Sequence, residues 1–140
     1  MHICHVSCPE SVEIINKAKW EINITCGVTP HHLLWTNEKL CPWPEGLMYK
    51  MNPPLRDRYD QEKLQRDLFA GRIDWIESDH ARHGACEKIF SPYLSGYPSL
   101  ELYSYLVDEF LPSIGFKEEK IKKITHDNIY KIFGNKLDAA

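Results

Sequence analysis

Short apolar segments and one helically spaced segment alternate along the first half of the chain. Residues 2–6, 21–28 and 73–78 are short and rich in β-prone side chains, which predicts three buried strands. Residues 9–20 carry apolar side chains near one face of a helix, and Pro9 suits the first turn of that helix. A strand, a helix and a second strand joined by short connections are typical of a parallel sheet. The pattern therefore predicts an α/β domain.

The remaining segments are predicted to be long loops and helices. Residues 30–58 and 79–98 form two long loops, and each follows a predicted strand. Loops of this length in a compact domain usually carry function. Pro112 and Gly115 are expected to end the helix before them. The helices predicted after the first one cover residues 61–70, 99–111, 117–124 and 127–133.

The composition argues against several classes of protein. The net charge is −3 with 26% charged residues and no basic face, so nucleic acid is not an expected partner. No apolar run reaches membrane-spanning length and no signal-peptide pattern is present, so a cytoplasmic setting is expected. The five cysteines are an odd number without a C-x-x-C pair, which argues against a disulfide framework. Cys4 and Cys26 are expected to be small apolar residues inside strands.

Histidines and an acid stand at the ends of the predicted strands. Because loops that follow parallel strands meet at one edge of a sheet, the segments near His5, His31 and Asp79 are expected to converge. Taken alone, His5 is better explained as a core histidine. For Asp79, a turn or helix cap is the alternative to a functional role, and the functional role is favoured. His31 and His32 are adjacent, so in extended backbone they would point in opposite directions and would not bind one metal as a pair.

The segment from Ile73 to His83 resembles the last-strand motif of dihydroorotases, which ends in Asp-His-Ala-Pro-His. Arg82 stands where that family has the proline. Three other segments resemble motifs of the same family in the same order, and the terminal segment resembles its closing helix more weakly. These segments are residues 2–7, 25–33, 52–56 and 128–134.

This resemblance implies a fold and an origin for the chain. A complete (β/α)₈ barrel usually needs about 250 residues. The 140 residues are therefore expected to be the C-terminal portion of a TIM-type barrel, with about three strands, six to eight, and the closing helices. Residues 1–140 would form one partial amidohydrolase barrel domain.

The resemblance also implies roles for residues near the strand ends. In dihydroorotases the residue matching His5 binds one of two metal ions, expected to be zinc. The residue matching Asp79 binds the other and serves as general acid and base. The resemblance gives His31, His32 and His80 supporting positions behind the metal ligands. Gly27 replaces a glutamate that is common at this point in the family.

The same comparison implies substrate contacts. The residue matching Asn52 lies against the pyrimidine ring, where its amide suits the N–H and C=O edges of that ring. The loop containing Gly96 also touches the substrate, and the residue matching His83 holds the substrate carboxylate. The substrate pair of the complete enzyme is dihydroorotate and carbamoyl-aspartate.

Several family features are absent from the chain, and they define the alternatives. The His-x-His of the first strand, the bridging acid or lysine, the fifth-strand histidine and an arginine for the substrate carboxylate are missing. Two ligands hold a catalytic zinc poorly, so the isolated chain is expected to be inactive without an N-terminal barrel half or a homo-oligomer. The alternatives are a related allantoinase or hydantoinase, or a non-catalytic partner of aspartate transcarbamoylase.

Overall fold

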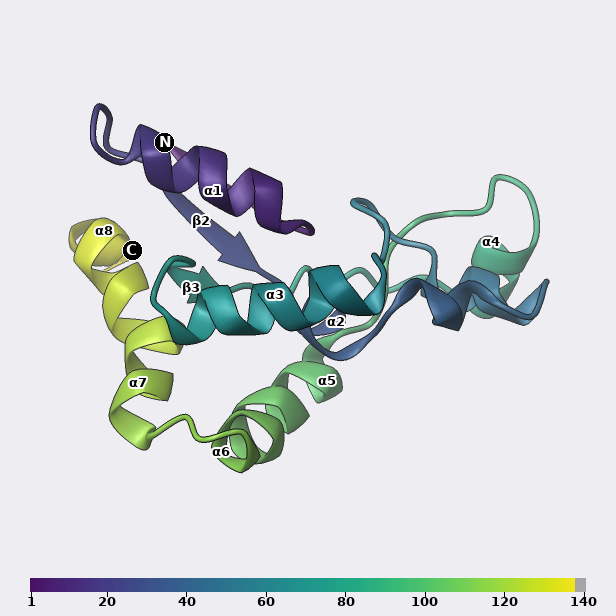
Figure 1. The fold of residues 1–140 in the computed structure, drawn as a ribbon. Helices are drawn as coiled ribbons and strands as arrows, with labels where there is room; N and C mark the ends of the chain where they lie inside the picture. Colours follow the sequence, from purple (N-terminus) through teal and green to yellow (C-terminus); the bar gives the residue numbers. More distant parts are fainter. Residues whose placement is uncertain (138–140) are drawn as a thin grey trace.

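A small parallel sheet forms the centre of the molecule (Figure 1). The computed structural model describes residues 1–137, and the side-chain environments of residues 1–134. The strands are β1 (His2–Ile3), β2 (Thr25–Val28) and β3 (Trp75–Ile76), in the order β1-β2-β3. The helices are α1 (Pro9–Ala18), α2 (Pro30–Leu34), α3 (Arg58–Phe69), α4 (Ala85–Ile89), α5 (Leu100–Tyr105), α6 (Leu111–Ser113), α7 (Glu118–Lys122) and α8 (Asn128–Leu137). The predicted α/β class with parallel strands is confirmed.

The strands are shorter than the apolar runs that predicted them. His2 pairs with Thr25, and Gly27 pairs with Trp75. Pairing continues irregularly past the strand ends, because the amide of Val6 donates to Gly27 and the amide of Glu77 donates to Val28. The first strand is interrupted at His5, whose φ of 57° lies in the left-handed region.

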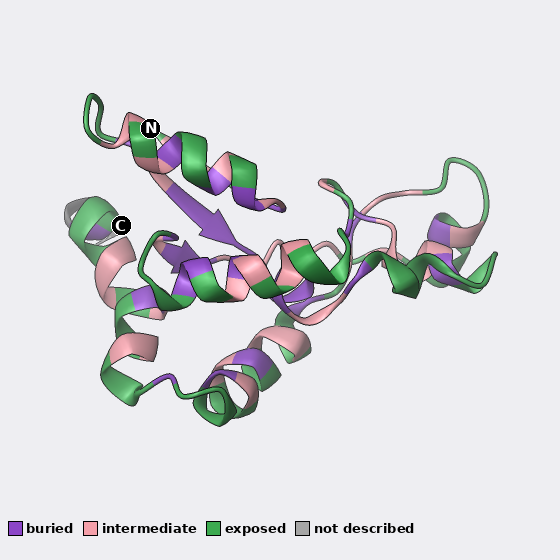
Figure 2. Cartoon of the chain, in the orientation of Figure 1, coloured by how far each residue is buried: buried purple, intermediate pink, exposed green. Residues whose placement is uncertain are grey.

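One face of the sheet packs on α1 and α3 to form the core (Figure 2). The apolar stripe of α1 enters this core through Val12 and Ile15, as its spacing predicted. Pro9 occupies the first turn of α1. The core side chains from the strands and α3 include Cys26, Val28, Leu64, Leu68 and Ile76.

The opposite face of the sheet carries polar and aromatic side chains. The imidazole of His2 stacks on the indole of Trp75 with ring centroids 4.2 Å apart. Phe133 of α8 meets the same indole edge-on at 6.0 Å. This face also carries Glu77, so it differs in chemistry from the apolar face that packs on α1 and α3.

The predicted long loops contain short helices. α2 follows β2 directly, two 3₁₀ turns cover Asn37–Leu40 and Glu45–Tyr49, and α4 lies inside the second loop. In Figure 1 these segments gather at the end of the sheet to which β2 points, whereas α8 and both termini lie at the other end.

Two predictions about the closing helices are wrong in detail. Pro112 does not end the preceding helix, since a π turn at Leu106–Phe110 leads into α6, and Pro112 lies in the first turn of α6. The chain turns instead near Gly115, whose φ is 95°. The two predicted terminal helices form one helical run, because a π turn at Lys123–Asp127 joins α7 to α8. Within the described part of the chain, no helix is both long and apolar enough to cross a membrane.

Candidate active site at the carboxyl ends of the strands

Two residues in left-handed backbone follow the edge strands. His5 follows β1 with a φ of 57°, and Asp79 follows β3 with a φ of 45°. Such conformations cost roughly 1–3 kcal/mol each and concentrate at functional sites. The two side chains meet, with His5 Nε2 3.4 Å from Asp79 Oδ1. The structure therefore brings together both residues predicted to bind metal.

His31 of α2 reaches the same carboxylate. Its Nε2 lies 3.7 Å from Asp79 Oδ2, beyond hydrogen-bond distance. The side chain is fully buried, and in the described part of the chain neither ring nitrogen has a hydrogen-bond partner. Burial, with smaller contributions from His32 and His5, lowers the pKa of His31 to about 3. A neutral, buried imidazole without a partner is free to accept a ligand or a proton donor.

The backbone at His31 and His32 is helical, not extended. Both lie in α2, which begins because Pro30 suits a first helical turn and the Thr29 side chain caps the amide of His32. Their ring centroids are 4.6 Å apart, so they do not point in opposite directions. The helix therefore places His31 in the site and leaves His32 behind it.

His32 ties α2 to the loop that carries Asn52. Its Nδ1 pairs with the hydroxyl of Thr29 at 2.7 Å, and its Nε2 donates to the carbonyl of Pro53 at 3.0 Å. Burial lowers the pKa of His32 to about 4, which keeps this doubly bonded ring neutral. Asn52 is exposed one residue before the anchored carbonyl. The predicted supporting role of His32 thus has a physical basis, the fixing of the Asn52 loop.

The second loop brings His83 and Gly96 together. A side chain at Gly96 would lie 3.1 Å from His83 Cδ2, and its φ of 130° is one that other residues rarely adopt. His80 forms an isolated bridge with Tyr97, which fixes the start of this loop. The amide of Gly96 donates to the carbonyl of Lys50 at 3.0 Å. The Asn52 loop and the His83–Gly96 loop are therefore joined through their backbones.

Lys88 of α4 was not singled out by the sequence. Its side chain is completely buried, and its ammonium donates to the carbonyls of Lys50, at 3.0 Å, and Gly96. Burial, with the nearby Lys50 charge, lowers the pKa of Lys88. A buried lysine of this kind holds the two loops to each other. A lysine in a polar loop carries no sequence signal for this role.

Glu77 is the other residue that sequence reasoning missed. Its carboxylate contacts His2, His5 and Trp75 from inside the polar face of the sheet. A signal was present, because an acid directly follows the apolar pair of β3 and Gly27 replaces a common glutamate on the neighbouring strand.

Cys4 corrects a further expectation. It is exposed instead of packed as an apolar strand residue. The ligand atoms of Cys4, His2 and Glu77 lie within 4.8 Å of one another. Both ring nitrogens of His2 are already bonded, to Thr25 and Glu77.

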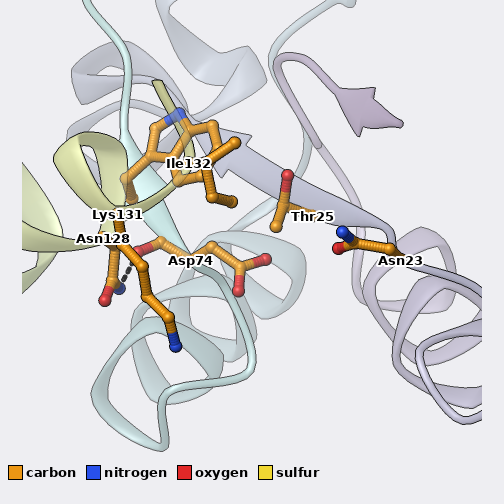
Figure 3. Close-up of a pocket in the computed structure, with 7 residues that line it drawn as sticks. Asn23, Thr25, Asp74, Asn128, Lys131 and Ile132 are labelled. Carbon is orange, nitrogen blue, oxygen red and sulfur yellow. Dashed lines mark hydrogen bonds between the residues drawn. The ribbon is translucent and has the colours of Figure 1, made fainter. Parts of the chain in front are cut away.

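One cleft lies away from these residues. It has a volume of about 550 Å³ and lies where β2 and β3 begin (Figure 3). Asn128 of α8 donates to the carbonyl of Asp74 at 2.6 Å across this cleft. The residues predicted to bind metal, His5 and Asp79, follow the other ends of the strands.

The donor set at the strand ends fits a divalent metal ion. Imidazole nitrogen and carboxylate oxygen are the usual ligands of catalytic zinc. His5 Nε2 and the carboxylate of Asp79 face each other, and the buried ring nitrogens of His31 have no hydrogen-bond partner among the described residues. Burial raises the pKa of Asp79, His5 opposes that shift, and Glu77 adds to it. A bound cation would counter the shift and keep this carboxylate ionised.

Comparison with solved structures defines the class of protein. D-Hydantoinase from Thermus sp. matches 94% of this chain and 31% of its own length with a TM-score of 0.87 and 24% identity. Dihydropyrimidinase from Brevibacillus agri matches 95% of this chain and 31% of its own length, with a TM-score of 0.83 and 25% identity. The fold is thus the α/β fold of amidohydrolase-type barrel proteins.

Comparison with curated sequences is more specific. Dihydroorotase from Fusobacterium nucleatum is 38% identical over 136 residues, which cover 94% of this chain and 32% of the relative. Dihydroorotase from Lactobacillus acidophilus is 51% identical over 88 residues, covering 62% of this chain and 20% of the relative. No family model matches the chain. The resemblance to dihydroorotases is confirmed: the chain is a homologue of these enzymes and spans a third or less of their length.

Proposed function

We propose that this chain supplies the part of a dihydroorotase active site formed by its last three barrel strands. The observation that carries the proposal is the meeting of His5 and Asp79 at the carboxyl ends of the two edge strands, with His31 beside the same carboxylate. The similarity to dihydroorotases over 94% of the chain gives this arrangement its chemistry. The complete enzyme would interconvert dihydroorotate and carbamoyl-aspartate.

His5 and Asp79 are the proposed metal ligands, and zinc is the proposed metal. Zinc held there supplies Lewis-acid polarisation of the cyclic amide carbonyl and acidification of water. Asp79 accepts the proton released by the attacking water and passes it to the leaving amide nitrogen. His31 stays neutral beside the second oxygen of Asp79.

Two loops are proposed to bind the substrate. The amide of Asn52 would pair with the N–H and C=O edges of the pyrimidine ring. His83 would hold the substrate carboxylate near Gly96. His32 and Lys88 support this proposal, because they fasten the two loops to α2 and to each other.

The test is a chimaera. Residues of this chain replace the matching 136 residues of the Fusobacterium dihydroorotase, which supplies the rest of a barrel. We expect turnover of dihydroorotate and its loss in Asp79→Asn. A folded chimaera that hydrolyses a 5-substituted hydantoin but not dihydroorotate would favour the hydantoinase alternative. A folded chimaera with neither activity would favour a non-catalytic homologue.

A further inference from the structure

The carboxylate of Glu77 is shared between the two edge strands. Oε2 accepts the backbone N–H of His5 at 3.0 Å and lies 2.7 Å from Nδ1 of the same residue. Oε1 contacts His2 Nε2 and accepts the indole N–H of Trp75 at 3.2 Å. The side chain is only 13% exposed. Buried carboxylates with this many partners are held in one orientation.

The conformation of His5 depends on this carboxylate. The left-handed backbone of His5 directs both its N–H and its Nδ1 to one oxygen of Glu77. Nδ1 lies within ion-pair distance of Oε2 without an aligned hydrogen bond. The other ring nitrogen, Nε2, is thereby left facing Asp79 at 3.4 Å. Metal-binding histidines usually donate their second ring N–H to such a carboxylate.

Gly27 leaves the space that Glu77 occupies. A Cβ built at Gly27 would overlap the carboxyl group of Glu77 and lie 2.7 Å from its Cγ. The backbone of Gly27 is outside the left-handed region, so its conformation does not require glycine. Glycine is needed here for space. A glutamate at this position, as in the resembled family, would compete with Glu77 for the same volume.

We propose that Glu77 is a positioning residue that holds the His5 imidazole with Nε2 facing Asp79, and that Gly27 provides the room for it. The carboxylate therefore comes from the residue after β3 in this chain, across from the strand where the resembled family usually carries one. The consequence for metal binding rests on the proposed function, whereas the orientation of His5 does not.

The experiment uses the whole 140-residue chain labelled with ¹⁵N and measures the histidine tautomers by NMR at pH 8. In the parent, His5 should carry its proton on Nδ1. Glu77→Gln keeps the shape but removes the charge, and a charge-assisted hydrogen bond is worth enough to change the tautomer ratio about tenfold or more. Gly27→Ala should give the same change with Glu77 still present, because the added Cβ displaces the carboxylate.

Three further variants separate positioning from general destabilisation. In a Glu77→Ala background, Gly27→Ala should cause no further change in the His5 tautomer and no further loss of stability, because the carboxyl group that its Cβ would overlap is gone. Gly27→Glu with Glu77→Ala should restore the Nδ1 proton from the other strand. Asp74→Asn is the matched control, since this β3-side carboxylate bonds Lys19 and the amide of Cys26 but not His5. It should leave the His5 tautomer unchanged.

The position of the proton on the His5 ring tests the proposal. If His5 keeps its Nδ1 proton in both Glu77→Gln and Gly27→Ala, the proposal is overturned. Zinc titration of the chimaera, with and without Glu77→Gln, then addresses the metal: outer partners of a ligand typically contribute 10–100-fold in affinity, and Glu77→Gln should lose that much. A tautomer change in the chain, with no zinc bound by His5 and Asp79 in the parent chimaera, would support the positioning role and count against the proposed function alone.

Discussion

Mild acid should destabilise the chain through the two buried histidines of α2. Burial lowers the pKa of His31 to about 3 and that of His32 to about 4, from an ordinary histidine value of 6.5. Below pH 6.5 both histidines bind protons in the unfolded chain, whereas in the folded chain they stay neutral until the pH approaches their lowered pKa values. The stability these rings contribute is therefore complete above pH 6.5 and is lost as pH falls towards their folded pKa values.

The size of the effect follows from these values. One pH unit below 6.5, each ring lowers the free energy of unfolding by about 1.4 kcal/mol, because one pKa unit corresponds to about 1.36 kcal/mol. Moving from pH 7.5 to 5.5 should therefore lower the free energy of unfolding by about 3 kcal/mol. The raised pKa of Asp79 acts with the opposite sign.

The assay is urea unfolding followed by tryptophan fluorescence at half-unit steps of pH. His32→Gln should lower by about one the number of protons taken up on unfolding. The slope of the unfolding free energy against pH should then fall by roughly 1.4 kcal/mol per pH unit between pH 5 and 6. The control is Leu34→Ala, a partly buried neighbour on the same helix that packs against the core. It should lower stability and leave the slope unchanged. An identical slope in His32→Gln and the parent would refute the buried-neutral assignment.

The other predictions concern the cap, the sheet edges and the chemistry. Thr29→Val removes the cap of α2 and a partner of His32, and should cost about 0.5–2 kcal/mol in urea unfolding, with Thr125→Val as a comparison at a helix interior. The isolated chain exposes β1 and β3 as sheet edges and should self-associate in light scattering; a clean monomer would contradict this. In the chimaera, Asp79→Asn should lower kcat by at least about 10²–10⁴-fold, more than His31→Ala or His32→Ala does. His83→Ala and Asn52→Ala should instead raise KM more than they lower kcat, measured at fixed metal occupancy.

Sequence patterns predicted the parallel sheet and the helix α1 because period and length are local properties. The positions of Val12 and Ile15 in the core follow from spacing alone. Strand ends were placed too late, because the left-handed turn at His5 leaves no mark in an apolar run. The helix at His31 was missed because two adjacent histidines carry little propensity, while the Thr29-Pro30 start that creates it is a capping signal.

The site was predictable only in part, for a similar reason. Resemblance pointed to His5 and Asp79, and the structure brings them together. The roles of Lys88 and Glu77 depend on partners far away in sequence, namely Lys50 and Gly96 for the lysine, and His2 and His5 for the acid. Only the fold reveals such pairings. Gly27, which replaces a glutamate common in the resembled family, is explained by the fold: the absence of a side chain there leaves room for Glu77.

We propose that His5 and Asp79 hold the catalytic metal ions at the ends of β1 and β3. Anomalous scattering at the zinc edge from crystals of the chimaera tests this assignment. We expect zinc at two positions, one within about 2.0–2.1 Å of His5 Nε2 and one within about 2.0–2.2 Å of an Asp79 carboxylate oxygen. A fully occupied zinc bound elsewhere, with His5 and Asp79 free of metal, would contradict it.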